Sequence, residues 1–134
     1  MSKFNLRDKI ESWDKKEIVR FGLFCCSKVK HFMDDKSLKI VGLIEKQLGD
    51  EGSAEREELK KAANIVANTV YTIDSTYYAA CTAVYAADAI TYYAAKATAS
   101  ITYAAHYAAK ALRSSEEAVY LNYMRNKLSD IMEN

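Results

Sequence analysis

Apolar side chains recur at steps of three and four residues along most of this chain, which is the spacing of an amphipathic helix. From Ile18 to Phe32 this pattern follows Asp14, a residue type that caps helix N-termini, and it returns after the acid pair Asp34 and Asp35. The pattern predicts helices over residues 14–33, 36–48, 54–73, 75–98, 100–113 and 115–132, and a short amphipathic turn or helix near residues 6–13.

The predicted helix ends rest on clusters of residues whose side chains bond to the local backbone. After Gly52 the chain has neither glycine nor proline, so it is expected to turn at Asp74-Ser75-Thr76, Thr98-Ala99-Ser100 and Ser114-Ser115. An unbroken helix over residues 54–111 would be about 87 Å long, too long for a compact chain of this size. We therefore expect an all-α fold, a compact helical bundle with a central pair of long helices rich in alanine and tyrosine.

The composition changes at residues 49–53. Residues 1–53 contain no alanine or tyrosine but all four phenylalanines and the single tryptophan, whereas residues 54–134 contain every alanine and all 10 tyrosines. Neither part has enough residues for a comfortable core of its own. We expect a single all-helical domain over residues 1–134.

Tyrosine follows a regular pattern in the second part of the chain. Tyr71, Tyr78, Tyr85 and Tyr92 are seven residues apart, and the tripeptide Tyr-Ala-Ala recurs between residues 78 and 109. On a continuous helix these side chains form one stripe. The stripe is typical of a core in which tyrosine supplies the volume that alanine lacks, and it also suits a ligand site in which rings flank a fixed cation. On the second interpretation the ligand-binding residues are Tyr92, Tyr93, Lys96, Tyr103, Tyr107 and Lys110.

The charge balance argues against nucleic acid as a partner. The chain carries 19 lysines and arginines against 18 aspartates and glutamates, too even a balance for a protein whose affinity comes from neutralising many phosphates. Polar residues such as Asp88, Lys96 and Ser100 interrupt the apolar runs that a membrane span needs. Thr91 and Thr102 are eleven residues apart, but the other threonines are out of register with them, which disfavours an ice-binding helix.

The chain has two histidines, and neither sits in a catalytic motif. His31 lies at the end of a predicted helix, where it can interact with the helix dipole. His106 shares a helix face with Asp88, so a general-base pair would form only if the chain folds back between them. The glycine-rich and nucleophile motifs of common enzyme families are absent from the sequence.

The remaining candidate groups have structural interpretations. Asp34 and Asp35 fit helix capping better than metal binding, because no further acid or histidine follows at ligand spacing. Cys25 and Cys26 are adjacent, and at least one of them is expected to be an inert buried thiol. An odd number of cysteines without a paired spacing, and a charged N-terminus without an apolar leader, indicate a cytoplasmic protein. We expect no enzyme activity, no cofactor and no metal.

Several of these segments together resemble a known family. They are Phe24-Cys25-Cys26, the pair Asp34-Asp35 followed by Leu38 and Ile40, and acidic residues 55–58 leading into Ala62-Ala63-Asn64 and the repeated Tyr-Ala-Ala. This pattern, over roughly residues 18–125, resembles the alanine-rich immunity protein family of bacteria and their phages. The resemblance implies neutralisation of a toxin by binding, and it implies no catalytic residues.

The sequence therefore predicts a non-enzymatic interaction protein. Its expected partner is a toxin, for an immunity protein, or a host defence component, for a phage counter-defence inhibitor. Besides exposed tyrosines, the expected partner-binding residues are Glu55, Glu57, Glu58, Glu116 and Glu117. The alternative is a sponge that sequesters an anionic nucleotide signal between tyrosine and lysine side chains, at an oligomer interface. Because residues 62–109 carry few charges, we also expect a homodimer or larger assembly.

Overall fold

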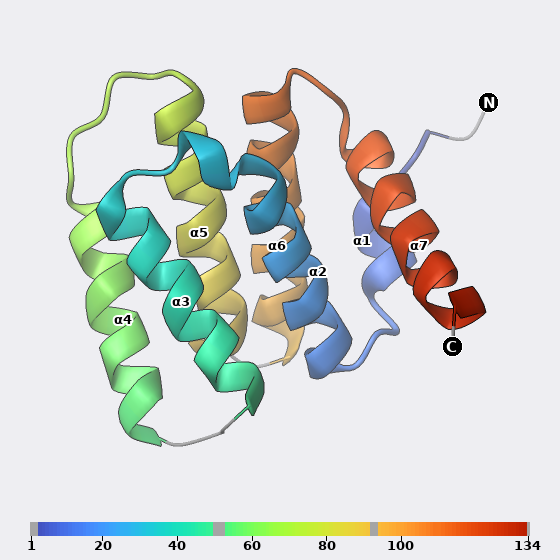
Figure 1. Ribbon diagram of the computed structural model, residues 1–134, viewed down its shortest axis with the longest axis horizontal. Coiled ribbons are helices and arrows are strands. Elements are labelled where there is room, and N and C mark those ends of the chain that lie inside the picture. Colours follow the sequence, from blue (N-terminus) through green and yellow to red (C-terminus); the bar gives the residue numbers. More distant parts are fainter. Residues whose placement is uncertain (1–2, 50–52, 92–93, 134) are drawn as a thin grey trace.

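The fold is all-α, as predicted (Figure 1). The computed structural model describes residues 3–49, 53–91 and 94–133, and within them every regular element is a helix. The α-helices are α1 (Leu6–Ile10), α2 (Lys15–Val29), α3 (Asp35–Gly49), α4 (Ser53–Ala67), α5 (Ser75–Thr91), α6 (Ala94–Leu112) and α7 (Glu116–Glu133), and η1 (Lys30–Phe32) is a 3-10 helix.

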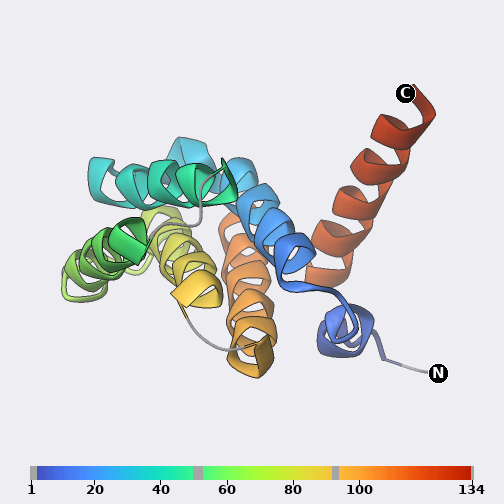
Figure 2. The ribbon, with the colours of Figure 1, turned by 90° about the horizontal axis from the view of Figure 1, so that it is seen from below.

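The helices lie in two layers. α2 and α3 cover one side of α4, α5 and α6, which lie side by side (Figures 1 and 2). α5 and α6 share the most extensive contact of any helix pair, so they form the expected central pair of helices rich in alanine and tyrosine. α1 and α7 lie beyond α2 and α6, and α7 points away from the other helices towards its C-terminal end (Figure 2).

Short acidic and hydroxyl side chains begin the helices as predicted. The Asp14 carboxylate accepts a hydrogen bond of 2.8 Å from the backbone N–H of Glu17, and the Asp34 carboxylate accepts one of 3.0 Å from that of Ser37. Each bond satisfies a donor that has no partner within its own helix. The capping interpretation of Asp14 and Asp34 is confirmed.

The predicted break at Thr98-Ala99-Ser100 is wrong, because α6 runs through all three residues. The Thr102 hydroxyl donates to the Thr98 carbonyl at 2.9 Å, one turn back, so it bonds within the helix rather than interrupting it. The chain instead reverses between Thr91, the last residue of α5, and Ala94, the first of α6. Neither glycine nor proline stands between Thr91 and Ala94, so the sequence carries no strong signal for the end of α5.

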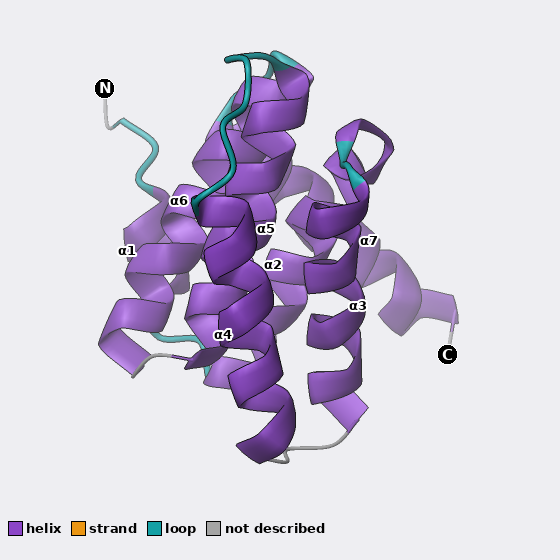
Figure 3. Ribbon diagram, turned by 90° about the vertical axis from the view of Figure 1, so that its left-hand side faces the viewer, coloured by secondary structure: helices purple, strands orange, loops and turns teal. Residues whose placement is uncertain are grey.

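The helix predicted over residues 54–73 ends earlier, at Ala67. Asn68 and Thr69 turn their side chains back onto the carbonyls of Asn64 and Ile65, at 2.9 and 2.6 Å. A loop then leads over to α5 (teal in Figure 3). The predicted helix over residues 14–33 also changes character, since its last turn, η1, is a 3-10 helix.

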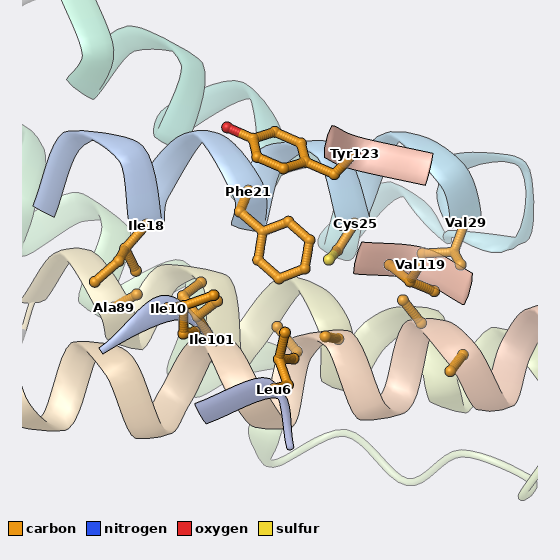
Figure 4. Close-up of a cluster of buried hydrophobic side chains, with 14 of the residues drawn as sticks. Leu6, Ile10, Ile18, Phe21, Cys25, Val29, Ala89, Ile101, Val119 and Tyr123 are labelled. Carbon is orange, nitrogen blue, oxygen red and sulfur yellow. The ribbon is translucent and has the colours of Figure 1, made fainter. Parts of the chain in front are cut away.

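Two clusters of buried side chains fill the space between the layers. One joins α1, α2, α5, α6 and α7 around the fully buried ring of Phe21 (Figure 4). The other joins α3, α4 and α5 around Ile40, Ile44 and Leu59. α2 contributes to both clusters, and most alanines of α5 and α6 are buried in them. None of the helices in the described part of the chain has the length and apolarity needed to cross a membrane.

Candidate binding face on α5 and α6

Tyrosines from α5 and α6 meet on one face of this helix pair. Tyr85 of α5 stacks on Tyr107 of α6 with ring centroids 5.6 Å apart and an interplanar angle of 5°. It also stacks on Tyr103 at 5.2 Å, while Tyr78 stacks on Tyr107 at 6.2 Å. We call these four residues, Tyr78, Tyr85, Tyr103 and Tyr107, the tyrosine face. Tyr78 and Tyr85 lie on α5 and Tyr103 and Tyr107 on α6, so the face is formed across two adjacent helices.

The tyrosine face is open to solvent. Tyr103 is 54% exposed, and the other three tyrosines are partly exposed. Partial burial raises the pKa of Tyr85 and Tyr107, and the neighbouring tyrosines add to this effect. Tyr85 and Tyr107 therefore stay uncharged at neutral pH, and the face offers aromatic surface with hydroxyl groups.

Lys110 supplies a cation beside these rings. Its Nζ lies 5.5 Å from the centroid of the Tyr78 ring and 5.9 Å from that of Tyr107, within the range of a cation–π contact. Lys96 is on the same face of α6 but fourteen residues earlier, about 21 Å along the helix. The predicted ligand residues Tyr103, Tyr107 and Lys110 therefore lie together, whereas Lys96 is distant and Tyr92 and Tyr93 lie outside the described residues.

Lys96 belongs to a different environment, near Asp88 of α5. Burial raises the pKa of Asp88 to about 6, and the charge of Lys96 opposes this shift. A hollow of about 260 Å³ beside Asp88 is lined by residues of α4 and α5, including Lys60 and Asn64.

A small hollow adjoins the tyrosine face on the side of α4. It has a volume of about 180 Å³ and includes Tyr77, Cys81 and Tyr85 in its lining, together with Tyr71 from the loop before α5. Partial burial raises the pKa of Cys81, so its thiol stays protonated and is a poor nucleophile. The sulfur of Cys81 in turn raises the pKa of Tyr77 to about 12. Tyr77 and Cys81 were not among the residues predicted from the sequence, although both lie on the tyrosine-bearing side of α5.

Tyr71, the first tyrosine of the seven-residue series, is not part of the tyrosine face. Its hydroxyl donates a hydrogen bond of 2.7 Å to Asp34, which ties the loop before α5 to the start of α3. Partial burial by itself raises the pKa of Asp34. The hydrogen bonds from Tyr71 and from the backbone of Ser37 outweigh it and hold this pKa below its usual range. The role of Asp34 is thus structural.

The five predicted partner-binding acids do not gather on one surface. Glu57 and Glu58 are exposed near the start of α4, and the side chain of Glu55 lies outside the described residues. Glu116 and Glu117 are near the start of α7, on the opposite side of the molecule (Figure 1). Of these acids, Glu116 contacts a neighbour of the tyrosine face, His106.

His106 links Glu116 to the tyrosine face. Its Nδ1 lies 3.1 Å from a carboxylate oxygen of Glu116, and its ring lies 5.3 Å from that of Tyr107. The pairing of His106 with Asp88 that the sequence left open is not formed. His31 instead packs on Phe32 at a centroid distance of 4.0 Å.

The two adjacent thiols and the acids provide no centre for chemistry within the described residues. Cys25 and Cys26 are fully buried, and burial raises the pKa of both, to about 12 for Cys26. The expected burial of at least one of them is confirmed, and it holds for both. No group of three or more histidine, cysteine or acidic side chains is placed to hold a metal ion in the described part of the chain.

Comparison of the chain with protein-family models, with curated proteins and with solved structures gives no match.

Proposed function

We propose that this protein is a non-enzymatic binding protein that neutralises a toxin or a host defence protein by docking it on the tyrosine face. The observation that carries the proposal is the group of four stacked, partly exposed tyrosines, with Tyr103 more than half exposed. Contiguous exposed aromatic surface of this kind marks interaction sites.

Tyrosine suits this role energetically. Residues that dominate binding energy at protein interfaces are enriched in tyrosine, which offers a large contact area and a hydroxyl at the cost of fixing only two side-chain torsions. Here Tyr85 already stacks on both Tyr103 and Tyr107, so little conformational freedom remains to be lost on binding. The surface is therefore preorganised for a partner.

The chemistry of the face also supports binding rather than catalysis. Tyr85, Tyr107 and the adjacent Cys81 have raised pKa values and are protonated at neutral pH, and Lys110 lies over aromatic rings. The class of partner rests on the resemblance to the alanine-rich immunity proteins. Both a toxin and a host defence protein would be disabled by a stable complex that covers a functional surface.

Replacing Tyr103 with alanine is expected to weaken binding about 10- to 100-fold, because an exposed aromatic anchor is lost from the centre of contact. The test is co-expression of this protein with a panel of bacterial toxins and defence effectors, scored by cell survival. The affinity of each protected pair is then measured by calorimetry. The melting temperature should change little, because Tyr103 is 54% exposed.

Two matched controls belong to this experiment. Tyr103→Phe keeps the ring and should retain most of the affinity. Leu128→Ala removes another exposed large apolar side chain, 58% exposed on α7, and should have no effect. If no panel member is neutralised, or if Leu128→Ala weakens binding as much as Tyr103→Ala, the tyrosine face is not the docking surface.

Lys110 favours a second candidate function, the sequestration of an anionic nucleotide. An ammonium group 5.5 Å from a tyrosine ring centroid provides both a stacking surface and a charge partner for phosphate. The hollow next to the face, at about 180 Å³, is smaller than the ~300–1,000 Å³ of ordinary ligand pockets. A nucleotide would therefore need a second copy of the chain to enclose it, as in the predicted homo-oligomer.

If this second function is correct, a cyclic or linear nucleotide at 100 times its Kd should stabilise the protein by about 2.7 kcal/mol. A thermal-shift screen with light scattering at tens of micromolar protein checks both the ligand and the assembly. Lys110→Ala should abolish the shift, whereas Lys96→Ala, which removes a lysine from the same helix, should preserve it. Flat melting curves across the nucleotide panel, or a monomeric mass with ligand present, would rule the sponge out.

A further inference from the structure

The hollow beside the tyrosine face has the dimensions of a site for one small molecule. It has a volume of about 180 Å³ and is lined from α4, from α5 and from the loop between them, which is teal in Figure 3. Its lining combines aliphatic side chains, among them Val66 of α4 and Val84 of α5, with the rings of Tyr71, Tyr77 and Tyr85. We call it the α4–α5 hollow.

The three tyrosines of the hollow are each held by a contact outside it. The Tyr71 hydroxyl donates a hydrogen bond of 2.7 Å to Asp34. The Tyr77 ring meets the edge of Tyr107 at a centroid distance of 6.4 Å, and Tyr85 stacks on the same ring at 5.6 Å. The aromatic lining is therefore in place before a ligand arrives, so little side-chain entropy is lost when one binds.

The lining of the hollow is uncharged. None of the described residues that line it has an acidic or basic side chain. Burial raises the pKa of Cys81, and the contact with Cys81 raises the pKa of Tyr77 to about 12, so both groups stay protonated at neutral pH. A charged ligand would lose hydration here without gaining an oppositely charged partner, which favours a neutral ligand.

Two of the hydroxyl groups in the lining already donate within the chain. The Tyr71 hydroxyl donates to Asp34, and the Thr69 hydroxyl donates to the carbonyl of Ile65 at 2.6 Å. What remains for a ligand is mainly aliphatic and aromatic surface. Aromatic rings attract one another in offset and edge-to-face arrangements, beyond the effect of buried area, so three tyrosine rings favour an aromatic ligand over an aliphatic one.

The volume of the hollow limits the ligand to about one ring. An apolar cavity of about 150 Å³ in a protein takes up one benzene molecule, whereas ordinary ligand pockets measure ~300–1,000 Å³. At about 180 Å³, the α4–α5 hollow is close to the first of these sizes.

From its size, its lack of charge and its three rings, we infer that the α4–α5 hollow binds one small neutral molecule with a single aromatic ring, which packs against Tyr77 and Tyr85 beside Cys81. The inference does not rest on the proposed docking function, because Tyr85 alone among the described lining residues also belongs to the tyrosine face.

The test is a titration of the isotopically labelled protein with phenol, followed by amide chemical shifts in NMR. We expect saturable shifts centred on residues 66–71 and 77–85. Cyclohexanol has the same hydroxyl and a ring of the same size without aromaticity, and it should bind about three- to tenfold more weakly. Benzoate keeps the aromatic ring but carries a charge, and it should bind at least about tenfold more weakly.

Two pairs of variants assign binding to the hollow. Cys81→Phe fills the hollow with a ring of the chain itself and should abolish phenol binding, whereas Cys81→Ser keeps the size of the side chain and should change the affinity by less than about twofold. Tyr77→Leu removes a ring from the lining and should weaken binding about three- to tenfold, whereas Tyr77→Phe keeps the ring and should retain the affinity. Thermal melts show whether each variant is folded.

Several results would overturn the inference. Shifts centred on residues 103–110 would place phenol on the tyrosine face instead of in the hollow. Equal binding of cyclohexanol or benzoate, full affinity in Cys81→Phe, or equal affinities of Tyr77→Leu and Tyr77→Phe would also contradict it. If Cys81→Phe does not fold, the comparison of the two Tyr77 variants decides.

Discussion

Replacing Phe21 with alanine is expected to lower the free energy of unfolding by about 3–5 kcal/mol, a large share of the stability of a domain of this size. Phe21 is fully buried between α1, α2 and α6, and its ring lies 5.0 Å from that of Tyr123 and 5.9 Å from that of Trp13 (Figure 4). Alanine would leave a cavity that rigid helices cannot close. Urea unfolding followed by circular dichroism measures the change.

Two further variants separate volume from other effects of this substitution. Phe21→Leu keeps most of the apolar volume and should cost less than about 1.5 kcal/mol. Tyr103→Ala removes an aromatic ring from the surface rather than from the core and should stay within about 0.5 kcal/mol of the parent. A loss below 1 kcal/mol for Phe21→Ala would mean that this core is not closely packed.

Gly22→Val is expected to destabilise the protein by about 1–3 kcal/mol, despite the better helix propensity of valine. A Cβ atom at Gly22 would lie 2.7 Å from Cδ1 of Ile101 and 3.5 Å from Cβ of Ala86. Glycine therefore allows α2 to approach α5 and α6 closely, and a larger side chain must displace the end of the buried Ile101 side chain or push these helices apart. Chemical denaturation gives the size of the effect.

Gly42 provides the matched control, because a Cβ atom there meets nothing within 4 Å. Gly42→Val should be neutral or slightly stabilising. A double-mutant cycle of Gly22→Ala with Ile101→Val tests the cause further. Gly22→Ala adds the Cβ atom, and Ile101→Val removes Cδ1, the atom that this Cβ meets. The two substitutions together should cost less than the sum of their separate costs. Equal effects of valine at positions 22 and 42, or simple additivity of the pair, would argue against a close approach at Gly22.

Local signals in the sequence predicted the helices well wherever a cap or a regular apolar spacing was present. Asp14 and Asp34 cap α2 and α3 through their own side chains, so both helix starts could be read from a few neighbouring residues. The three- and four-residue spacing of apolar side chains predicted a helix over residues 115–132, and α7 begins and ends within one residue of these bounds. Hydroxyl side chains were weaker signals of helix ends. Thr102 and Thr69 each donate to the carbonyl four residues back, but Thr102 lies within α6 whereas Thr69 follows the end of α4.

The candidate site was predictable in its residue types but not in its arrangement. Tyrosine and lysine at helical spacing indicated an aromatic face with a cation, and Tyr103, Tyr107 and Lys110 do lie together. Tyr71 was misplaced because it lies in the loop before α5, where its hydroxyl bonds to Asp34. The acids Glu57 and Glu117 lie far apart in space, which spacing along the chain does not reveal.

The sequence by itself determined the all-α class, the caps, the buried cysteines and the tyrosine-bearing side of each helix, because these follow from interactions among residues a few positions apart. Only the tertiary structure decided where α5 ends, which tyrosines stack on one another, and that α4 and α5 enclose a hollow beside Tyr77 and Cys81. The physical reason is that these features depend on how closely whole helices approach. That distance is set by small residues such as Gly22 and the buried alanines, acting between segments far apart in the chain.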